Sequence, residues 1–376
     1  MFDVVSEEAI REGVATDAYF LRTEEALDHA GRDPHVVAEV TADQFPTGEF
    51  EVLAGVKDAA HLLSGLPVDV HALAEGTHFD GGPVMRIEGH YRAFARYETS
   101  LLGFLSYASA VATAAREVKA AAPDRPVLSF GARHIHPAAT AALERSALIG
   151  GVDGFSHVAA GEVLGREAGG TMPHALVICF GRGRQEEAWR AFDEGVGPEV
   201  PRVALVDTYS DEVDEALRAV EAVPDLDSVR LDTTSSRRGD FRHIAREVRW
   251  ELDARGHEDV GIFASGGLTP ETVRHLYDVV DGFGVGSYVS NADPVDFALD
   301  IVEREGEPAA KRGKLSGTKQ VYRTPDGGHH VALEGTEIEG EPLLEPLLED
   351  GEIVREFDIE AAAERCRADA ARVRGD

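Results

Sequence analysis

Apolar and polar residues alternate along four short segments in the first third of the chain. Apolar side chains occupy every second position there, a period that indicates half-buried strands. These segments are residues 35–40, 50–53, 69–73 and 84–91. From Glu98 to Ala122 the apolar residues instead recur at the spacing of one helix face. We therefore expect a mixed α/β domain over residues 1–122, closed by Pro123 and Pro126.

The pattern changes after residue 126. Short apolar runs now alternate with amphipathic segments, and the runs lie at residues 127–128, 175–178, 203–206, 229–231, 260–263 and 283–285. Ser210, Asp240 and Thr269 each precede a helical pattern, and Pro270 falls in the first turn of the last one. Repeating βα units with continuously apolar strands predict a buried parallel sheet, either closed as a barrel or open and doubly wound. We expect this second domain to span residues 123–290.

The pattern weakens beyond residue 290. Residues 290–322 are expected to complete the first domain, with a strand in Lys311–Tyr322 that returns to it. Residues 323–376 are expected to form a small C-terminal region, whose sequence predicts no particular fold.

Composition narrows the partners and the environment. The formal net charge is −32, and only five of the 37 basic residues are lysines. A surface of this charge repels nucleic acid and anionic lipid, and salt would screen its self-repulsion. We therefore expect neither a nucleic-acid nor a membrane partner and favour a salt-rich cytoplasm, with an acidic protein of an ordinary cytoplasm as the alternative. Cys179 and Cys366 alone make no disulfide framework, and the acidic N-terminus lacks the apolar segment of a signal peptide.

Glycine-rich turns follow two of the late strands. One contains Gly266 and Gly267, and the other contains Gly284 and Gly286. Free backbone N–H groups and a helix start at such turns favour a phosphate group. Ordinary tight turns are the alternative for each turn taken alone, and the succession of two favours phosphate binding.

Carboxylates and arginines follow the neighbouring strands. Asp207 and Asp232 occupy matching positions after two runs, where the carboxyl ends of parallel strands carry reactive groups. Paired carboxylates suit Mg²⁺ or ribose hydroxyl groups, and helix capping is the alternative. Arg237 lies in a serine-rich loop and suits an anionic ligand, unless it forms an ordinary surface ion pair.

An aromatic ring, an arginine and histidines complete the candidate chemistry. The Phe130 ring suits stacking on a flat heterocycle and Arg133 suits a carboxylate. His174 precedes an apolar run that we expect to be a buried strand, and a lone histidine in that place is more often structural. No lysine occurs between Lys119 and Lys311, which argues against Schiff-base chemistry on the second domain's strands. The chain also lacks a P-loop motif.

Eight segments, in this order, resemble the nicotinate phosphoribosyltransferase family, most closely its archaeal branch. They are Thr16–Phe20, Ser129–Pro137, Ile149–Gly154, Gly170–His174, Asp207–Tyr209, Arg230–Gly239, Ser265–Leu268 and Phe283–Gly286, and they span roughly residues 1–320. The resemblance implies a type II phosphoribosyltransferase fold: an incomplete α/β barrel, an N-terminal α/β sandwich domain and a small C-terminal region. It also implies a homodimer or a higher oligomer.

The resemblance assigns roles to residues as well. Tyr19 would stack on the pyridine ring from the neighbouring subunit, with Phe130 on the other face. Anionic groups of the substrates would contact Arg133, Ser156 and Thr171. The ribose and the Mg²⁺–pyrophosphate end would be held by Asp207, Arg230 and Asp232, and phosphate groups by Arg237, Gly266, Gly267, Gly284 and Gly286. His174 resembles the histidine that ATP phosphorylates in many members.

The implied activity is therefore the transfer of phosphoribose from 5-phosphoribosyl 1-pyrophosphate (PRPP) to nicotinate in NAD salvage. It would use Mg²⁺ and be coupled to ATP through phosphorylated His174. Some archaeal relatives carry four cysteines near the C-terminus, whereas residues 324–330 here contain none, which argues against zinc.

Three alternatives share part of these features. A quinolinate phosphoribosyltransferase has the same fold, but it must bind two carboxylates and is expected to carry more basic residues around the acid pocket. A nicotinamide phosphoribosyltransferase differs only in the base consumed. A non-catalytic regulator that binds phosphoribosyl compounds would keep Gly266 and Gly267 without needing Asp207, Asp232 and His174 together.

Overall fold

The computed structural model describes residues 2–46, 50–232, 239–325 and 327–374. The chain divides into two compact units. Unit 1 contains residues 1–113, 148–151 and 293–376, and unit 2 contains residues 114–147 and 152–292. Within the described residues, no helix is long and apolar enough to cross a membrane.

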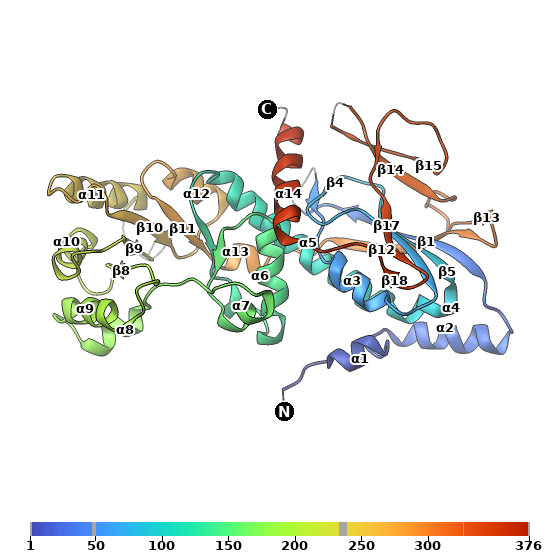
Figure 1. The fold of residues 1–376 in the computed structure, drawn as a ribbon, viewed down its shortest axis with the longest axis horizontal. Helices are drawn as coiled ribbons and strands as arrows, with labels where there is room; N and C mark the ends of the chain where they lie inside the picture. Colours follow the sequence, from blue (N-terminus) through green and yellow to red (C-terminus); the bar gives the residue numbers. More distant parts are fainter. Residues whose placement is uncertain (1, 47–49, 233–238, 326, 375–376) are drawn as a thin grey trace. The chain divides into compact units, whose positions relative to one another are not determined.

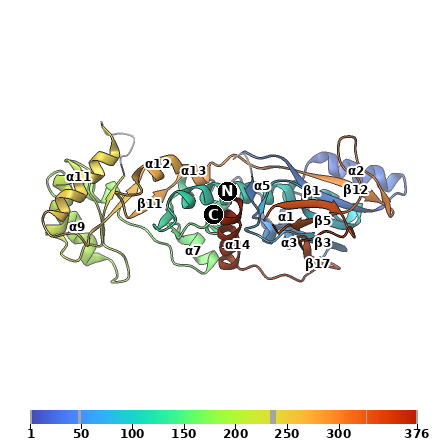
Figure 2. The same ribbon diagram turned by 90° about the horizontal axis from the view of Figure 1, so that it is seen from above.

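A seven-stranded antiparallel sheet forms the centre of unit 1. Its order is β13(Glu307–Pro308), β12(Asp296–Arg304), β1(His35–Gln44), β5(Pro83–His90), β3(Val68–Ala72), β17(Glu345–Glu349) and β18(Glu352–Ile353). Figure 2 shows β12, β1, β5, β3 and β17 following one another across this sheet. The alternating segments near residues 35, 69 and 84 thus form strands as expected.

Helices accompany this sheet in unit 1. They are α1(Glu7–Arg11), α2(Ala18–His29), α3(Val56–Leu63), α4(Tyr91–Phe94), α14(Ile359–Arg374) and the first part of α5(Glu98–Ala121). The expected long helix is confirmed as α5, which buries Leu101, Leu105 and Val111. Two small sheets complete the unit: β2(Glu51–Val52) with β4(His78–Phe79), and β15(His329–Leu333), β14(Lys319–Arg323) and β16(Glu341–Pro342).

The strand that returns to the N-terminal sheet is not the one expected. We placed it in Lys311–Tyr322, but β12 pairs with β1, and β14 pairs with β15 and β16 in a separate sheet. Lys319, at the start of β14, still connects the two parts of the unit, because its ammonium group lies 2.8 Å from the buried Glu39 carboxylate on β1.

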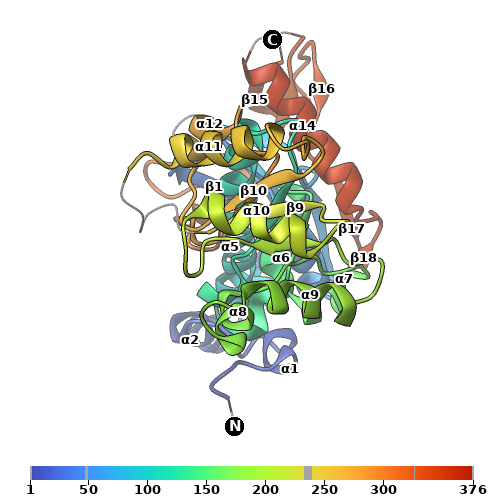
Figure 3. The ribbon, with the colours of Figure 1, turned by 90° about the vertical axis from the view of Figure 1, so that its left-hand side faces the viewer.

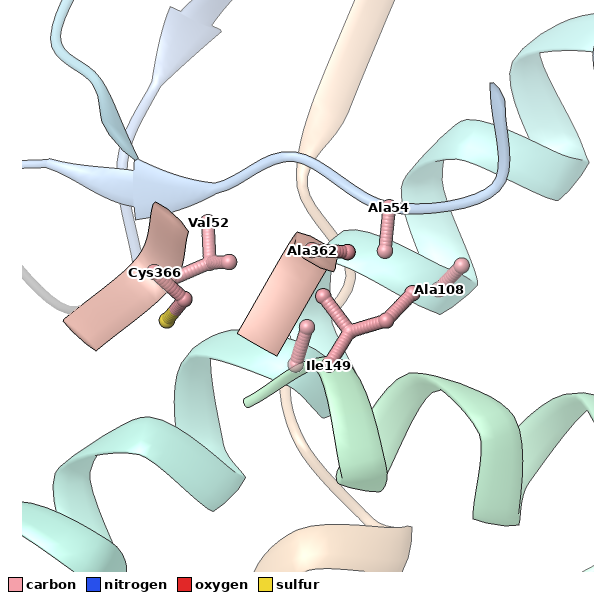
Figure 4. Packing of buried hydrophobic residues seen from close by; sticks show 7 residues of the cluster. Val52, Ala54, Ala108, Ile149, Ala362 and Cys366 are labelled. Carbon is pink, nitrogen blue, oxygen red and sulfur yellow. The ribbon is translucent and has the colours of Figure 1, made fainter. Parts of the chain in front are cut away.

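The end of the chain packs into the core of unit 1. Helix α14 lies beside β4 (Figure 1). Ala362 and Cys366 on this helix pack with Val52, Ala54 and Ala108 in one apolar cluster, which Figure 4 shows from close by. Cys366 is buried there and therefore contributes as a small apolar side chain.

Unit 2 is an α/β layer built on a six-stranded parallel sheet. The order is β7(Gly154–Phe155), β6(Val127–Ser129), β11(Gly282–Val285), β10(Gly261–Ser265), β9(Ser228–Leu231) and β8(Val203–Leu205). The described strands β7 and β8 are the two edges of this sheet and do not pair with each other. The expected parallel α/β fold is therefore confirmed, and the sheet has the open edges of an incomplete barrel.

Helices connect the parallel strands. They are α6(Thr140–Ile149), α7(Val158–Leu164), α8(His174–Phe180), α9(Gln185–Gly195), α10(Glu212–Ala222), α11(Phe241–Asp253), α12(Pro270–Leu276) and α13(Ser287–Ser290). Figure 3 shows α8, α9, α10 and α11 as successive neighbours. The side chains of Asp240 and Thr269 cap α11 and α12 as the sequence indicates.

One expected strand is a helix. Residues 175–178 belong to α8, which begins after Pro173 and leaves Ile178 54% exposed. A short apolar run cannot by itself distinguish a buried strand from a half-exposed helix.

Candidate active site

Two aspartates lie at the carboxyl ends of neighbouring parallel strands in unit 2. Asp207 follows β8 and Asp232 follows β9, as the sequence predicts. The Asp207 carboxylate accepts the backbone N–H of Asp232 at 2.6 Å, so it joins the two strand ends. The Asp207 side chain is only 1% exposed, whereas the Asp232 side chain is 29% exposed. Asp232 is thus the carboxylate that faces a ligand more openly.

His174 joins these aspartates from the first turn of α8. Its Nε2 lies 2.9 Å from Oδ1 of Asp207, and its Nδ1 lies 3.8 Å from Oδ2 of Asp232. The hydrogen bond to Asp207 raises the pKa of His174, although burial and the charge of Arg230 oppose the shift. The fold therefore brings the three candidate residues together and favours the imidazolium form of His174.

Arg230 lies beside this triad on β9. Its guanidinium group donates to the Thr171 hydroxyl and lies 3.8 Å from Oδ2 of Asp232. Burial lowers the pKa of Arg230, and the positive charge of Arg133 lowers it further. Within the described residues its Nε–H has no hydrogen-bond partner. A buried cation that keeps a free donor is suited to a bound anion.

Phe130 supplies an aromatic surface next to Arg230. The ring follows β6, and the Arg230 guanidinium carbon lies 6.0 Å from its centroid. A Cβ on Gly284 would lie 2.3 Å from the Phe130 ring, so only glycine leaves the ring its place against β11. Arg133 follows Phe130 closely in the chain, in a short helical turn at residues 132–134, and is exposed.

The glycine turns lie at the ends of β10 and β11. Gly266 and Gly267 have φ angles of 93° and 69°, which other residues rarely adopt. The turn leads into α12, whose Thr269 cap also forms a capping box with Thr272. Gly284 lies under the Phe130 ring, and a Cβ on Gly286 would lie 3.0 Å from the His134 ring. Phosphate binding at these glycines stays a prediction.

Three further candidates have different positions. Ser156 directly follows β7 and is half-buried. Tyr19 belongs to α2 of unit 1, where its side chain is 56% exposed and its hydroxyl lies 3.5 Å from the Asp17 carboxylate. Arg237 lies outside the described residues.

Sequence reasoning missed two polar residues that contact the aspartates or their loop. The Ser265 hydroxyl, at the end of β10, donates to Oδ1 of Asp232. The buried Glu215 on α10 accepts backbone N–H groups from the loop after Asp207. A serine before a glycine turn could have been noticed, but nothing in the helical pattern around Glu215 marks its carboxylate.

The carboxylates fit a metal that a substrate brings with it. In the described part of the chain, no three His, Cys, Asp or Glu side chains gather closely enough to hold a metal ion by themselves. Mg²⁺ commonly takes one or two carboxylates and completes its shell with phosphate oxygens and water. The Asp232 carboxylate, the more accessible of the two, suits that arrangement, with the buried Asp207 next to it.

A parallel sheet with aspartates, arginines and glycine turns at its carboxyl edge defines a type II phosphoribosyltransferase. Family models match accordingly: quinolinate phosphoribosyl transferase, N-terminal domain, over residues 17–109, and its C-terminal domain over residues 111–300. The chain therefore belongs to the quinolinate phosphoribosyl transferase family.

Solved structures agree with this fold. The chain is similar to the nicotinate-nucleotide pyrophosphorylase of Pyrococcus furiosus, with 50% identity, a TM-score of 0.95 and coverage of 99% of this chain and 98% of that one. Human nicotinic acid phosphoribosyltransferase has the same fold, with a TM-score of 0.78 and 22% identity over 95% of this chain and 94% of that one.

Curated relatives are more distant. The nicotinate phosphoribosyltransferase pncB1 of Mycobacterium tuberculosis is 29% identical over 89% of this chain and 81% of its own length. The Bacillus subtilis nicotinate phosphoribosyltransferase is 28% identical over 67% of this chain and 54% of its own length. These relatives support the coarser assignment, a phosphoribosyltransferase of pyridine nucleotide biosynthesis.

The expected acceptor and the expected ATP coupling were wrong. We expected transfer to nicotinate with phosphorylation of His174 by ATP. Both family models instead describe quinolinate phosphoribosyl transferase, and the structure that shares half of its residues with this chain is a nicotinate-nucleotide pyrophosphorylase. The resemblance of Gly170–His174 to a phosphorylated-histidine segment had argued against quinolinate, but the structure gives His174 another partner, the Asp207 carboxylate at 2.9 Å.

Proposed function

We propose that this protein is a quinolinate phosphoribosyltransferase, which forms nicotinate mononucleotide from quinolinate and PRPP. The observation that carries the proposal is the buried Arg230 guanidinium group, which lies 6.0 Å from the centroid of the Phe130 ring and feels the positive charge of Arg133. Quinolinate is a flat ring with two adjacent carboxylates. Two cations and an aromatic surface match that charge and shape, since guanidinium groups bind carboxylates well.

The proposed reaction requires two bond changes on the pyridine ring. The ring nitrogen attacks the anomeric carbon of PRPP, and the bond from that carbon to pyrophosphate breaks. The carboxylate next to the ring nitrogen then leaves as CO₂, and its electron pair on the ring carbon takes a proton. No base is needed for the first step, because the attacking nitrogen carries no proton.

His174, Asp207 and Asp232 suit the charges that develop on the ribose and on the leaving pyrophosphate. Positive charge builds on the ribose as pyrophosphate leaves, and Asp207 and Asp232 lie at the strand ends where carboxylates would offset it. Mg²⁺, when bound with PRPP, would neutralise the leaving group, with Asp232 and Asp207 as the protein carboxylates. The imidazolium form of His174 offers a proton close to these groups.

Titration of binding tests the acceptor. We expect quinolinate to bind more tightly than nicotinate, and Arg133→Ala to weaken quinolinate binding by about 10- to 100-fold, the usual loss for a charge-assisted hydrogen bond. Nicotinate has one carboxylate, so the same substitution should weaken the binding of nicotinate less. Equal losses for both ligands would contradict the role of two cations.

We also propose that the enzyme works as a homodimer, or a higher oligomer, in which Tyr19 enters the neighbouring site. Tyr19 is exposed, and Phe2, Val5 and Val14 in the same N-terminal segment are at least 62% exposed, which suits burial against a second copy. Mixing a Tyr19→Ala chain with an Asp207→Asn chain tests this. Shared sites predict recovered activity in the mixture, whereas two additive residual activities would contradict the proposal.

A cytoplasmic location, in a salt-rich cell, is part of the proposal as well. The net charge of −32 and the scarcity of lysine support the salt-rich environment. An affiliation with the archaeal branch of these phosphoribosyltransferases is likewise proposed, supported by the 50% identity to the Pyrococcus furiosus enzyme.

A further inference from the structure

A fully buried carboxylate lies behind the loop that carries Asp207. Glu215 belongs to α10, and its side chain accepts three consecutive backbone N–H groups. The donors are Thr208 at 3.0 Å, Tyr209 at 2.8 Å and Ser210 at 2.8 Å. The loop directly after Asp207 is thus bound to one negative charge.

A second helix holds the Glu215 carboxylate in place. The Gln185 side-chain amide, on α9, donates to Oε1 of Glu215 at 3.1 Å. On the same helix, the Trp189 indole N–H donates to the Leu205 carbonyl at 3.1 Å, at the end of β8. Both contacts fix the last residues of β8 and the loop that follows against α9 and α10.

These contacts are not the capping of α10 itself. The Asp211 side chain caps that helix by accepting the N–H of Val213 at 3.0 Å. The three donors to Glu215 all precede the helix. A buried carboxylate that accepts several charge-assisted hydrogen bonds from one loop restricts the backbone of that loop strongly.

The position of Asp207 follows from this loop. Asp207 immediately precedes the three donors, and its own carboxylate reaches the Asp232 N–H at 2.6 Å and His174 at 2.9 Å. We propose that Glu215 is a positioning residue of the active site, which holds the loop at residues 208–210 so that Asp207 meets Asp232 and His174. The expected effect on catalysis rests on the proposed function. The placement of the loop rests on geometry alone.

Glu215→Gln tests the positioning role. The amide has nearly the same shape but turns an NH₂ group toward a backbone donor. We expect kcat to fall by about 10- to 100-fold, the scale of a misplacement near 1 Å. The KM for quinolinate should change less than kcat, because Phe130 and Arg133 are outside this network and Arg230 approaches it only through Asp232, at 3.8 Å. Glu215→Asp, which keeps the charge but is one methylene shorter, should give the same kind of loss and serves if the glutamine variant does not fold.

A double-mutant cycle separates positioning from general stability. In an Asp207→Asn background, Glu215→Gln should lower kcat by less than about 2-fold, because coupled residues are non-additive. Glu187→Gln is the matched control: it breaks the exposed ion pair with Arg184 at the start of α9 and does not contact the loop. Its kcat should be that of the parent. Full additivity of the two losses, or an equal loss in the control, would overturn the inference.

Hydrogen–deuterium exchange provides a measurement that does not need turnover. In Glu215→Gln, peptides covering residues 206–211 and the Asp232 amide should exchange faster, while peptides from β10 and β11 should exchange as in the parent. Unchanged exchange at residues 206–211 would overturn the placement of the loop. If exchange changes as expected and no acceptor is turned over, the proposed function fails and the loop contact stands.

Discussion

The ring of Phe130 lies directly against Gly284, where a Cβ would come within 2.3 Å of ring atom Cε2. The two residues belong to neighbouring parallel strand ends, because β6 pairs with β11. Gly284 was expected to bind phosphate, and its observed contact is with the aromatic surface. The placement of the proposed pyridine-binding ring therefore depends on glycine at position 284, which has no Cβ.

Gly284→Ala should displace the Phe130 ring. Because an added Cβ would meet atoms of the packed Phe130 ring, the ring must move. We therefore expect the KM for the pyridine acid to rise by about 10-fold or more, in line with the cost of small misplacements. Steady-state kinetics with varied acceptor measures this. Gly103→Ala is the control, since a Cβ there meets nothing within 4 Å. An unchanged KM in Gly284→Ala would show that the ring position does not matter for binding.

Arg230→Lys should disable the site although the charge is kept. Lysine cannot reproduce the planar donor set that binds Thr171 and faces Asp232. We expect kcat/KM to fall by about 10- to 100-fold, the range for losing hydrogen bonds to charged groups. Arg255→Lys, whose guanidinium group pairs with Glu251 near the end of α11 and is 49% exposed, is the matched control and should keep parent kinetics. Parent-like kinetics of Arg230→Lys would mean that charge alone suffices.

Glu144 should make unit 2 less stable as the pH rises. Its side chain on α6 is fully buried, and burial raises its pKa to about 7. A raised pKa in the folded state contributes stability that is fully present below the unfolded value near 4.5 and is lost as the pH rises through about 7. The loss at pH 8 is about 3 kcal/mol, from about 1.4 kcal/mol per pKa unit.

Glu144→Gln should remove that loss. Urea unfolding of parent and variant between pH 4 and pH 8 checks it, with the difference between the two curves growing in favour of the variant above pH 5. Glu98 in unit 1, whose pKa is also raised to about 7 by burial, titrates in the same window. The difference curve cancels its contribution, and a difference that is constant with pH would contradict the buried-acid account.

Salt should stabilise the protein. With a net charge of −32, self-repulsion weakens as KCl rises from 0.1 M to 1 M, where the screening length falls from about 10 Å to about 3 Å. We expect the thermal midpoint to rise over this range. A midpoint that is independent of KCl would remove the support for a salt-rich environment.

The sequence predicted the sheet of unit 2 well, because a short continuous apolar run marks each of its strands. Continuous apolar runs near residues 203, 229, 261 and 283 became β8, β9, β10 and β11. Asp207 and Asp232 could be placed at neighbouring strand ends for the same reason. The run at residues 175–178 failed, because its helical form depends on Pro173 and on exposure that a short run does not encode.

Contacts between distant segments were beyond sequence reasoning. The approach of Arg133 to Arg230, the contact of Glu215 with residues 208–210 and the packing of Cys366 against Val52 all depend on tertiary structure. The first of these supports the proposed acceptor. The proposed acid pocket combines Arg230 on β9 with Arg133 in the turn after β6, two residues that are about a hundred positions apart in the sequence.

Turnover with each acceptor tests the central claim most directly. Quinolinate, nicotinate and nicotinamide are supplied separately with PRPP and Mg²⁺ in high-salt buffer, and nicotinate mononucleotide, CO₂ and pyrophosphate are measured. We expect nicotinate mononucleotide from quinolinate, with one CO₂ released per product and no dependence on ATP. Turnover of nicotinate alone, increased by ATP, would contradict the account and restore the acceptor that the sequence first suggested.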